Sequence, residues 1–133
     1  MVDEKVVNGI ALRLDRGVLV ARPSDCRLTD LSRVQTIAET IRGEFGRAEI
    51  GVLVECSQLI YEVTSQFLGM LVRLRKEALD KNLSLGVCGL QGTLRDAFTV
   101  AQLMRIIPVF EGPESVFDNL AAFAPAARPP RGP

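Results

Sequence analysis

Gly51-Val-Leu-Val-Glu55 and Thr64-Ser-Gln-Phe-Leu-Gly69 are the stretches that decide the fold, because they mark a strand and the start of the helix after it. The first is a short apolar run rich in β-branched residues, which is typical of a buried strand. After the second, apolar residues recur at spacings of three and four as far as Asp80, which predicts a helix with one buried face. Thr64 and Ser65 therefore stand where a helix begins.

Two hydroxyl side chains at a helix start admit two interpretations. Ser and Thr are favoured N-cap residues, because their oxygens accept hydrogen bonds from free backbone N–H groups. The same N–H groups and the positive end of the helix dipole would also stabilise a phosphate on Ser65. From these residues alone the structural cap is the commoner case.

The segments on either side of these stretches alternate in type. The expected elements are a β-hairpin over 10–21 with its turn at Gly17, a helix over 29–45, strands over 83–88 and 107–110, and helices over 93–106 and 113–123. Strands that alternate with helices imply parallel neighbours joined by crossovers. The sequence therefore predicts an α/β fold with a mixed sheet of four to five strands and four helices, in the order ββαβαβαβα. We expect residues 1–8 to be an N-terminal extension, 9–123 a single domain, and 124–133 a disordered tail of Ala, Pro and Arg.

Composition restricts the functional class. The 133 residues are 47% hydrophobic, and Lys plus Arg equals Asp plus Glu at 16 each. The charges are mixed along the chain, without the basic stripe that nucleic-acid binding requires. No apolar run approaches the roughly 20 residues that span a bilayer. We expect a cytoplasmic protein without nucleic-acid binding or membrane insertion.

The residues that most enzymes use are scarce. Histidine, the commonest general base and metal ligand, is absent. Cys26, Cys56 and Cys88 lack the paired spacing of a disulfide framework or a zinc site. Cys56 and Cys88 each close a predicted strand, so we expect them to be neighbours at one edge of the sheet and to act as small reduced hydrophobes, with a redox pair as the minor alternative. The sequence predicts no enzyme, no metal and no cofactor.

Five segments in order resemble the STAS family, the domain of anti-sigma-factor antagonists. Its usual signature is an apolar strand ending in Asp-Leu-Ser, a connection, and then Asp-Ser-Ser-Gly-Leu-Gly at the start of a helix. Here the counterparts are Val52-Leu-Val-Glu-Cys-Ser57, Thr64-Ser-Gln-Phe-Leu-Gly69, the helical run Met70-Leu-Val-Arg-Leu-Arg-Lys76, Leu83-Ser-Leu-Gly-Val-Cys-Gly-Leu90 and Leu103-Met-Arg-Ile-Ile-Pro-Val-Phe110. The resemblance covers roughly Ile10 to Phe123 and implies a STAS-like (SpoIIAA-like) fold.

The resemblance also implies a switch. Family members are phosphorylated on the first Ser of the motif by a partner serine kinase that is itself an anti-sigma factor, and the unphosphorylated form binds that kinase. Carried over, the phosphoacceptor is Ser65, with Thr64 as its alternative. The partner-binding residues implied are Thr29, Asp30, Thr64, Gln66, Phe67, Leu68 and Gly69. The chain departs from the motif where Thr64 replaces Asp, Gln66 replaces the second Ser and Phe67 replaces the first Gly.

Three hypotheses follow for function. The first is a non-catalytic anti-sigma-factor antagonist switched at Ser65. The second is a STAS subunit bound constitutively in a transporter or a stress-signalling scaffold, without phosphorylation. The third, from a different class, is a phosphocarrier or small enzyme that uses Cys56 or Cys88 at a strand end, for which Gly89 to Thr93 is the loop available to supply backbone N–H groups.

Overall fold

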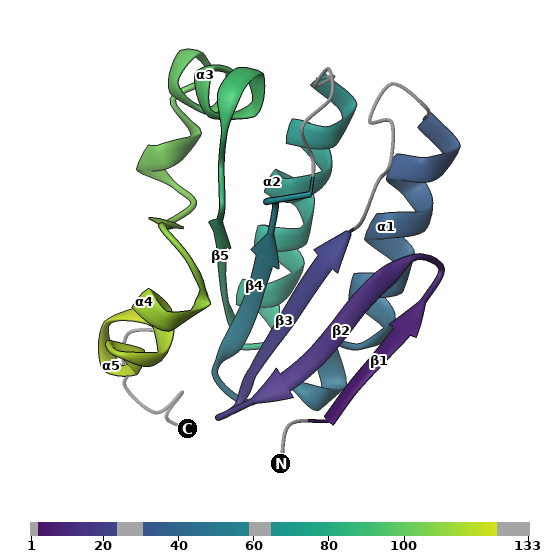
Figure 1. Ribbon diagram of the computed structural model, residues 1–133, viewed down its shortest axis with the longest axis vertical. Coiled ribbons are helices and arrows are strands. Elements are labelled where there is room, and N and C mark those ends of the chain that lie inside the picture. Colours follow the sequence, from purple (N-terminus) through teal and green to yellow (C-terminus); the bar gives the residue numbers. More distant parts are fainter. Residues whose placement is uncertain (1–2, 24–30, 59–64, 125–133) are drawn as a thin grey trace, which may run out of the picture.

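The computed structural model describes residues 3–23, 31–58 and 65–124, which form one six-stranded sheet with helices on both faces (Figure 1). The strands are β1 (Asp3–Val7), β2 (Ile10–Asp15), β3 (Val18–Pro23), β4 (Gly51–Glu55), β5 (Ser84–Cys88) and β6 (Val109–Phe110). The helices are α1 (Leu31–Gly43), α2 (Ser65–Asp80), α3 (Gly92–Val100), α4 (Pro113–Phe117) and α5 (Leu120–Phe123), with 3-10 turns η1 (Phe45–Arg47) and η2 (Leu103–Arg105). The predicted α/β class with a mixed sheet is confirmed, with one strand and one helix more than expected.

The additional strand is β1, which lies in the segment predicted as an N-terminal extension. It pairs antiparallel with β2, and Val7 lies opposite Ile10. The turn between them is Asn8-Gly9, where both residues have positive φ (53° and 75°). Arg16 and Gly17 repeat this geometry between β2 and β3 (φ 50° and 81°). Two central residues with positive φ are characteristic of the type I′ turn, which matches the twist of paired strands. The sheet therefore begins at β1, within the segment predicted as an extension.

The sheet follows the order of the chain, β1-β2-β3-β4-β5-β6, and its last four strands are parallel. Central strands β3 and β4 are buried almost throughout, as expected for strands covered on both faces. Helices α1 and α2 lie side by side on one face (Figure 1). Alternate side chains of the strands pack with them in the larger core, which also takes Leu94 and Phe98 of α3.

The second face has a smaller core, built by α4 and α5. Val116 and Phe123 are buried there against Val18, Leu53 and Cys88. The prediction of a single helix over 113–123 is therefore wrong, because the structure has two short helices there. Asn119 leaves the helical region of the backbone (φ −143°, ψ 53°). The break allows α5 to turn back, so that the ring of Phe123 packs over Gly51 and Gly86.

Candidate functional site

Ser65 is the first residue of α2, and its side chain is exposed, as is that of Gln66. The helix begins at the end of the molecule where β3, β4 and β5 finish (Figure 1). Because α2 is 16 residues long, its first turn carries the free N–H groups and positive dipole end of a full helix. An anionic group on Ser65 would be stabilised at this position.

Phe67 points away from this surface. The resemblance places it among the partner contacts, but its side chain is 0% exposed and lies in the larger core. It is the first buried residue of α2, and the buried face of the helix continues through Met70, Leu71, Leu74 and Ala78. Leu68 is half-buried against the same core. Phe67 therefore supports the site from beneath and cannot contact a partner.

Gly69 leaves the surface open one turn after Ser65. It is exposed, and a Cβ placed on it would meet no atom within 4 Å. In a helix, residues four apart lie on the same face, so Ser65 and Gly69 are surface neighbours. Of the predicted site residues, the structure thus brings Ser65, Gln66 and Gly69 together on an open face. Thr29, Asp30 and Thr64 lie outside the described residues.

A groove between α1 and α2 extends from this face and was not predicted from the sequence. Its volume is about 500 Å³. The residues that line it are Val34, Gln35, Ala38, Glu39, Arg42, Gln66, Met70 and Arg73. Gln66 belongs both to the groove and to the motif, so the two are continuous. The sequence shows that each of the two helices carries polar residues outside its buried face. It does not show which of these residues face the neighbouring helix and line a groove.

An ion pair ties α1 to α2 beside this groove. Arg42 donates two hydrogen bonds to the carboxylate of Glu77, from Nε to Oε2 and from a terminal nitrogen to Oε1 at 2.9 Å. This hydrogen bonding lowers the pKa of Glu77 below its ordinary value and raises that of Arg42. A bidentate arginine–carboxylate pair fixes orientation as well as distance. The two helices that form the groove are therefore held at a defined separation.

The ends of β4 and β5 are joined just before the chain proceeds towards α2. Ser57 donates a hydrogen bond from Oγ to Oε1 of Glu55 (2.9 Å), and its carbonyl accepts one from Nε2 of Gln91 (3.2 Å). Gly89 has a positive φ of 72°, and a Cβ there would lie 3.0 Å from the Ser57 nitrogen. The close approach requires glycine, and it anchors the strand end that precedes the candidate phosphoacceptor.

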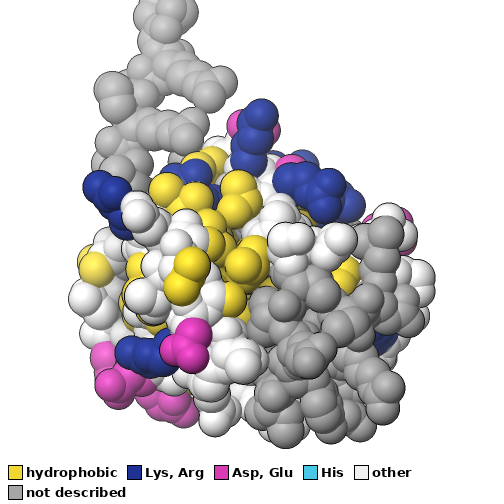
Figure 2. All heavy atoms as spheres, turned by 90° about the horizontal axis from the view of Figure 1, so that it is seen from above, with side chains coloured by type: hydrophobic (Ala, Val, Ile, Leu, Met, Phe, Trp, Pro, Cys, Tyr) yellow, Lys and Arg dark blue, Asp and Glu magenta, His cyan; other side chains and the backbone are white. Residues whose placement is uncertain are grey.

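Hydrophobic side chains also reach the surface at this end of the molecule. Figure 2, which looks onto it from above, shows a cluster of them over the side on which α3 lies. Val100, the last residue of α3, is 84% exposed, and Met104 in η2 is 39% exposed. Exposed apolar side chains beside a polar face are common in protein-binding surfaces.

Cys56 and Cys88 are neighbours in the backbone, as predicted, but not in their side chains. The Cys56 N–H donates to the Cys88 carbonyl at 2.8 Å. Their side chains are buried in different cores, on opposite faces of the sheet, and neither cysteine forms a disulfide. Burial, with the nearby carboxylates of Glu55 and Glu114, raises the pKa of Cys88 to about 12. This environment opposes thiolate chemistry, so it counts against the cysteine-based hypothesis.

We accordingly expect neither thiol to react in the native protein. In a Cys26→Ser background, iodoacetamide at pH 8 should leave both Cys56 and Cys88 unmodified by intact mass, whereas the unfolded chain should take up two groups. Since Cys88 keeps its proton far above pH 8, alkylation depends on unfolding. Rapid labelling of the folded protein would restore the cysteine-based hypothesis.

Comparison with known proteins defines the class of fold. No family model and no curated protein matches the sequence. Among solved structures, the chain is similar to the anti-sigma-factor antagonist SpoIIAA in its unphosphorylated form (TM-score 0.66, 15% identity, covering 92% of this chain and 97% of that one). It is similar to an anti-sigma-factor antagonist (STAS) domain protein from Planctomyces limnophilus (TM-score 0.66, 17% identity, 84% and 97% covered). It is also similar to a serine-to-glutamate variant of RsbS from Moorella thermoacetica (TM-score 0.63, 18% identity, 91% and 95% covered).

The chain therefore has the fold of STAS domains and anti-sigma-factor antagonists, and it spans nearly the whole of each of these structures. The resemblance inferred from the sequence is confirmed at the level of the fold. Within the residues described, no helix is both long and apolar enough to cross a membrane.

Proposed function

We propose that this protein is a non-catalytic regulatory module that binds a protein partner and releases it when Ser65 is phosphorylated. The observation that carries the proposal is the exposed Ser65 on the first turn of α2, next to the open surface at Gly69 and the groove between α1 and α2. The partner implied is an anti-sigma factor that is also a serine kinase, because the fold is that of anti-sigma-factor antagonists.

The chemistry of the switch is supplied by the partner. The hydroxyl of Ser65 loses its proton to the kinase, its oxygen forms a bond to the γ-phosphorus of ATP, and ADP leaves. The product carries close to two negative charges at neutral pH. The helix terminus stabilises these charges within the protein, while a partner surface packed against α2 would have to desolvate them. Phosphorylation therefore favours the free module over the complex.

The test uses Ser65→Ala, Ser65→Asp and the host's anti-sigma-factor serine kinases, each purified. With Mg-ATP, the wild-type chain should gain the mass of one phosphate, mapped to Ser65, and Ser65→Ala should gain none. By titration calorimetry, Ser65→Ala should bind the kinase as the wild type does. Ser65→Asp should bind at least about thirtyfold more weakly, the effect of a hot-spot residue.

Two further variants separate the switch from general damage. Thr93→Asp places the same charge near another exposed helix N-terminus, that of α3, and should leave binding unchanged. Gly69→Arg should weaken binding without loss of stability, because its side chain starts in open space. If Ser65→Asp and Ser65→Ala bind equally and no phosphate is found, the constitutive-subunit hypothesis replaces the switch.

A further inference from the structure

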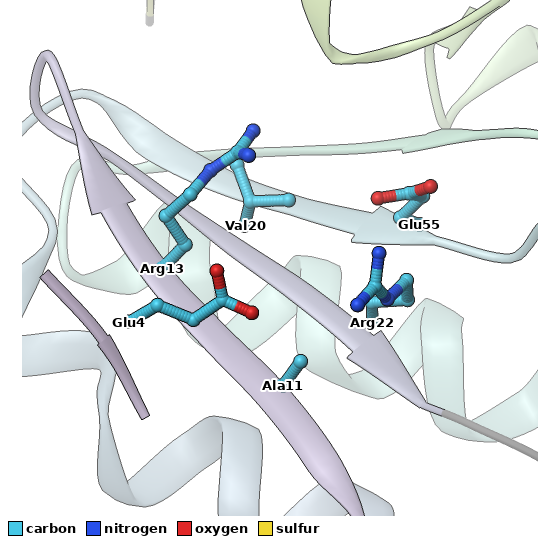
Figure 3. A pocket seen from close by; sticks show the side chains of 6 residues that line it. All are labelled: Glu4, Ala11, Arg13, Val20, Arg22 and Glu55. Carbon is cyan, nitrogen blue, oxygen red and sulfur yellow. The ribbon is translucent and has the colours of Figure 1, made fainter. Parts of the chain in front are cut away.

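The second face of the sheet is only partly covered, because α4 and α5 lie over the β4–β6 side (Figure 1). On the part formed by β1, β2 and β3, together with the end of β4, there is a pocket of about 70 Å³ (Figure 3). It is lined by Glu4, Ala11, Arg13, Val20, Arg22 and Glu55. None of these residues lies on α2, although Glu55 also accepts the hydrogen bond from Ser57 at the strand end before that helix.

Strand pairing places the charged residues of this pocket in two rows. Arg13 lies between Glu4 of β1 and Val20 of β3. Arg22 lies opposite Ala11 of β2, and the parallel register of β3 with β4 brings it next to Glu55. We refer to Glu4, Arg13, Arg22 and Glu55 as the charged quartet. Around Val20 its charges alternate in sign in the view of Figure 3.

Within the charged quartet, Arg13 and Glu55 are partly buried, whereas Glu4 and Arg22 are exposed. Among the described residues, Nε of Arg13 is the one buried side-chain nitrogen or oxygen atom without a hydrogen-bond partner. Within the same part of the chain, no ion pair links any two members of the charged quartet. Glu55 accepts one hydrogen bond, from Ser57. A buried donor without a partner is costly, so an arrangement of this kind favours a bound group that supplies acceptors.

The charges of the pocket select the kind of ligand. A simple anion would be attracted by two guanidinium groups and repelled by two carboxylates. A simple cation would be attracted by the carboxylates and repelled by the guanidinium groups. A molecule that carries one charge of each sign can pair with both kinds of group. The side chains of Val20 and Ala11 form the apolar floor, and the small volume admits only a few heavy atoms. We propose that the pocket binds a small zwitterion of the α-amino acid class, with its carboxylate at the arginines and its ammonium group at the glutamates.

The experiment is a titration of the ¹⁵N-labelled protein, followed by the amide shifts of Ala11 and Val20. Each of the common amino acids is tested, with acetate and methylammonium as single-charge controls. We expect saturable shifts for one or more small amino acids, with a dissociation constant of about 1 mM or tighter. Arg13→Gln and Glu55→Gln should each weaken binding at least about tenfold, because each removes a charge-assisted hydrogen bond.

The matched control is Lys76→Gln, which removes an exposed charge on α2 and should leave the affinity unchanged. Saturable binding of acetate with the same affinity would overturn the zwitterion in favour of a plain anion site. An absence of saturable shifts with every amino acid, in protein shown to be folded by the same spectra, would overturn the site itself. Neither outcome bears on Ser65, so the proposed switch is tested separately.

Discussion

Phe67→Ala is expected to lower the free energy of unfolding by about 3 to 5 kcal/mol, the usual cost of removing a buried aromatic ring. The ring is fully buried in the larger core, at the start of the stripe by which α2 packs on the sheet. Truncation removes the apolar contact and leaves a cavity that the strands cannot close. Chemical denaturation followed by circular dichroism measures the loss.

Two variants show that this effect arises from the core. Phe67→Leu should cost clearly less than Phe67→Ala, because most of the buried volume is kept. Ser65→Ala, two residues earlier on the exposed side, should change stability by no more than about 0.5 kcal/mol. Phe67→Gly, which introduces the residue usual in the STAS motif, should cost about 1 kcal/mol more than Phe67→Ala, since glycine is the poorer helix former. Full stability of Phe67→Ala would contradict the placement of this ring.

Gly51→Ala is expected to destabilise the protein by about 3 kcal/mol, the upper end of the usual cost of overpacking. The added Cβ would lie 2.6 Å from the carbonyl oxygen of Ser84 and 2.7 Å from the ring of Phe123. The ring has some freedom to move, but the carbonyl belongs to the strand next to β4. Relief of the contact therefore requires the β4–β5 pairing to shift.

A glycine-to-alanine substitution at Gly69 provides the control, because it should raise the stability of the protein instead of lowering it. Gly69→Ala adds its methyl group to open space on a helix, so it should stabilise the protein by up to about 1 kcal/mol. Thermal unfolding of the two variants beside the wild type gives both results in one experiment. Equal midpoints for the two variants would show that the contact between Gly51 and its neighbours is not tight.

Much of the fold could be predicted because the deciding signals are local. The apolar run before Glu55 and the helical periodicity from Ser65 to Asp80 gave both elements with accurate boundaries. β1 was missed because its charged residues resemble an exposed terminus. Asn8-Gly9, a strong turn signal, could have revealed it.

The candidate site was predicted less completely, since it depends on contacts between distant segments. Ser65 could be placed at the helix start from its immediate neighbours. The stripe formed by Phe67, Leu71 and Leu74 already favoured a buried Phe67, whereas the family motif favoured an exposed one, and the periodicity was correct. The groove and the charged quartet depend on helix packing and strand register, which no local pattern specifies.

The strand order has a consequence for the synthesis of the protein. Each strand pairs with the one made just before it, from β1 to β6. No strand has to be inserted between two that are already paired, so the sheet can grow at one edge as the chain leaves the ribosome. The helices α1 and α2 are each made before the next strand and can cover the growing sheet in turn. Short sequence separation between partners lowers the entropy cost of pairing and favours rapid folding during translation.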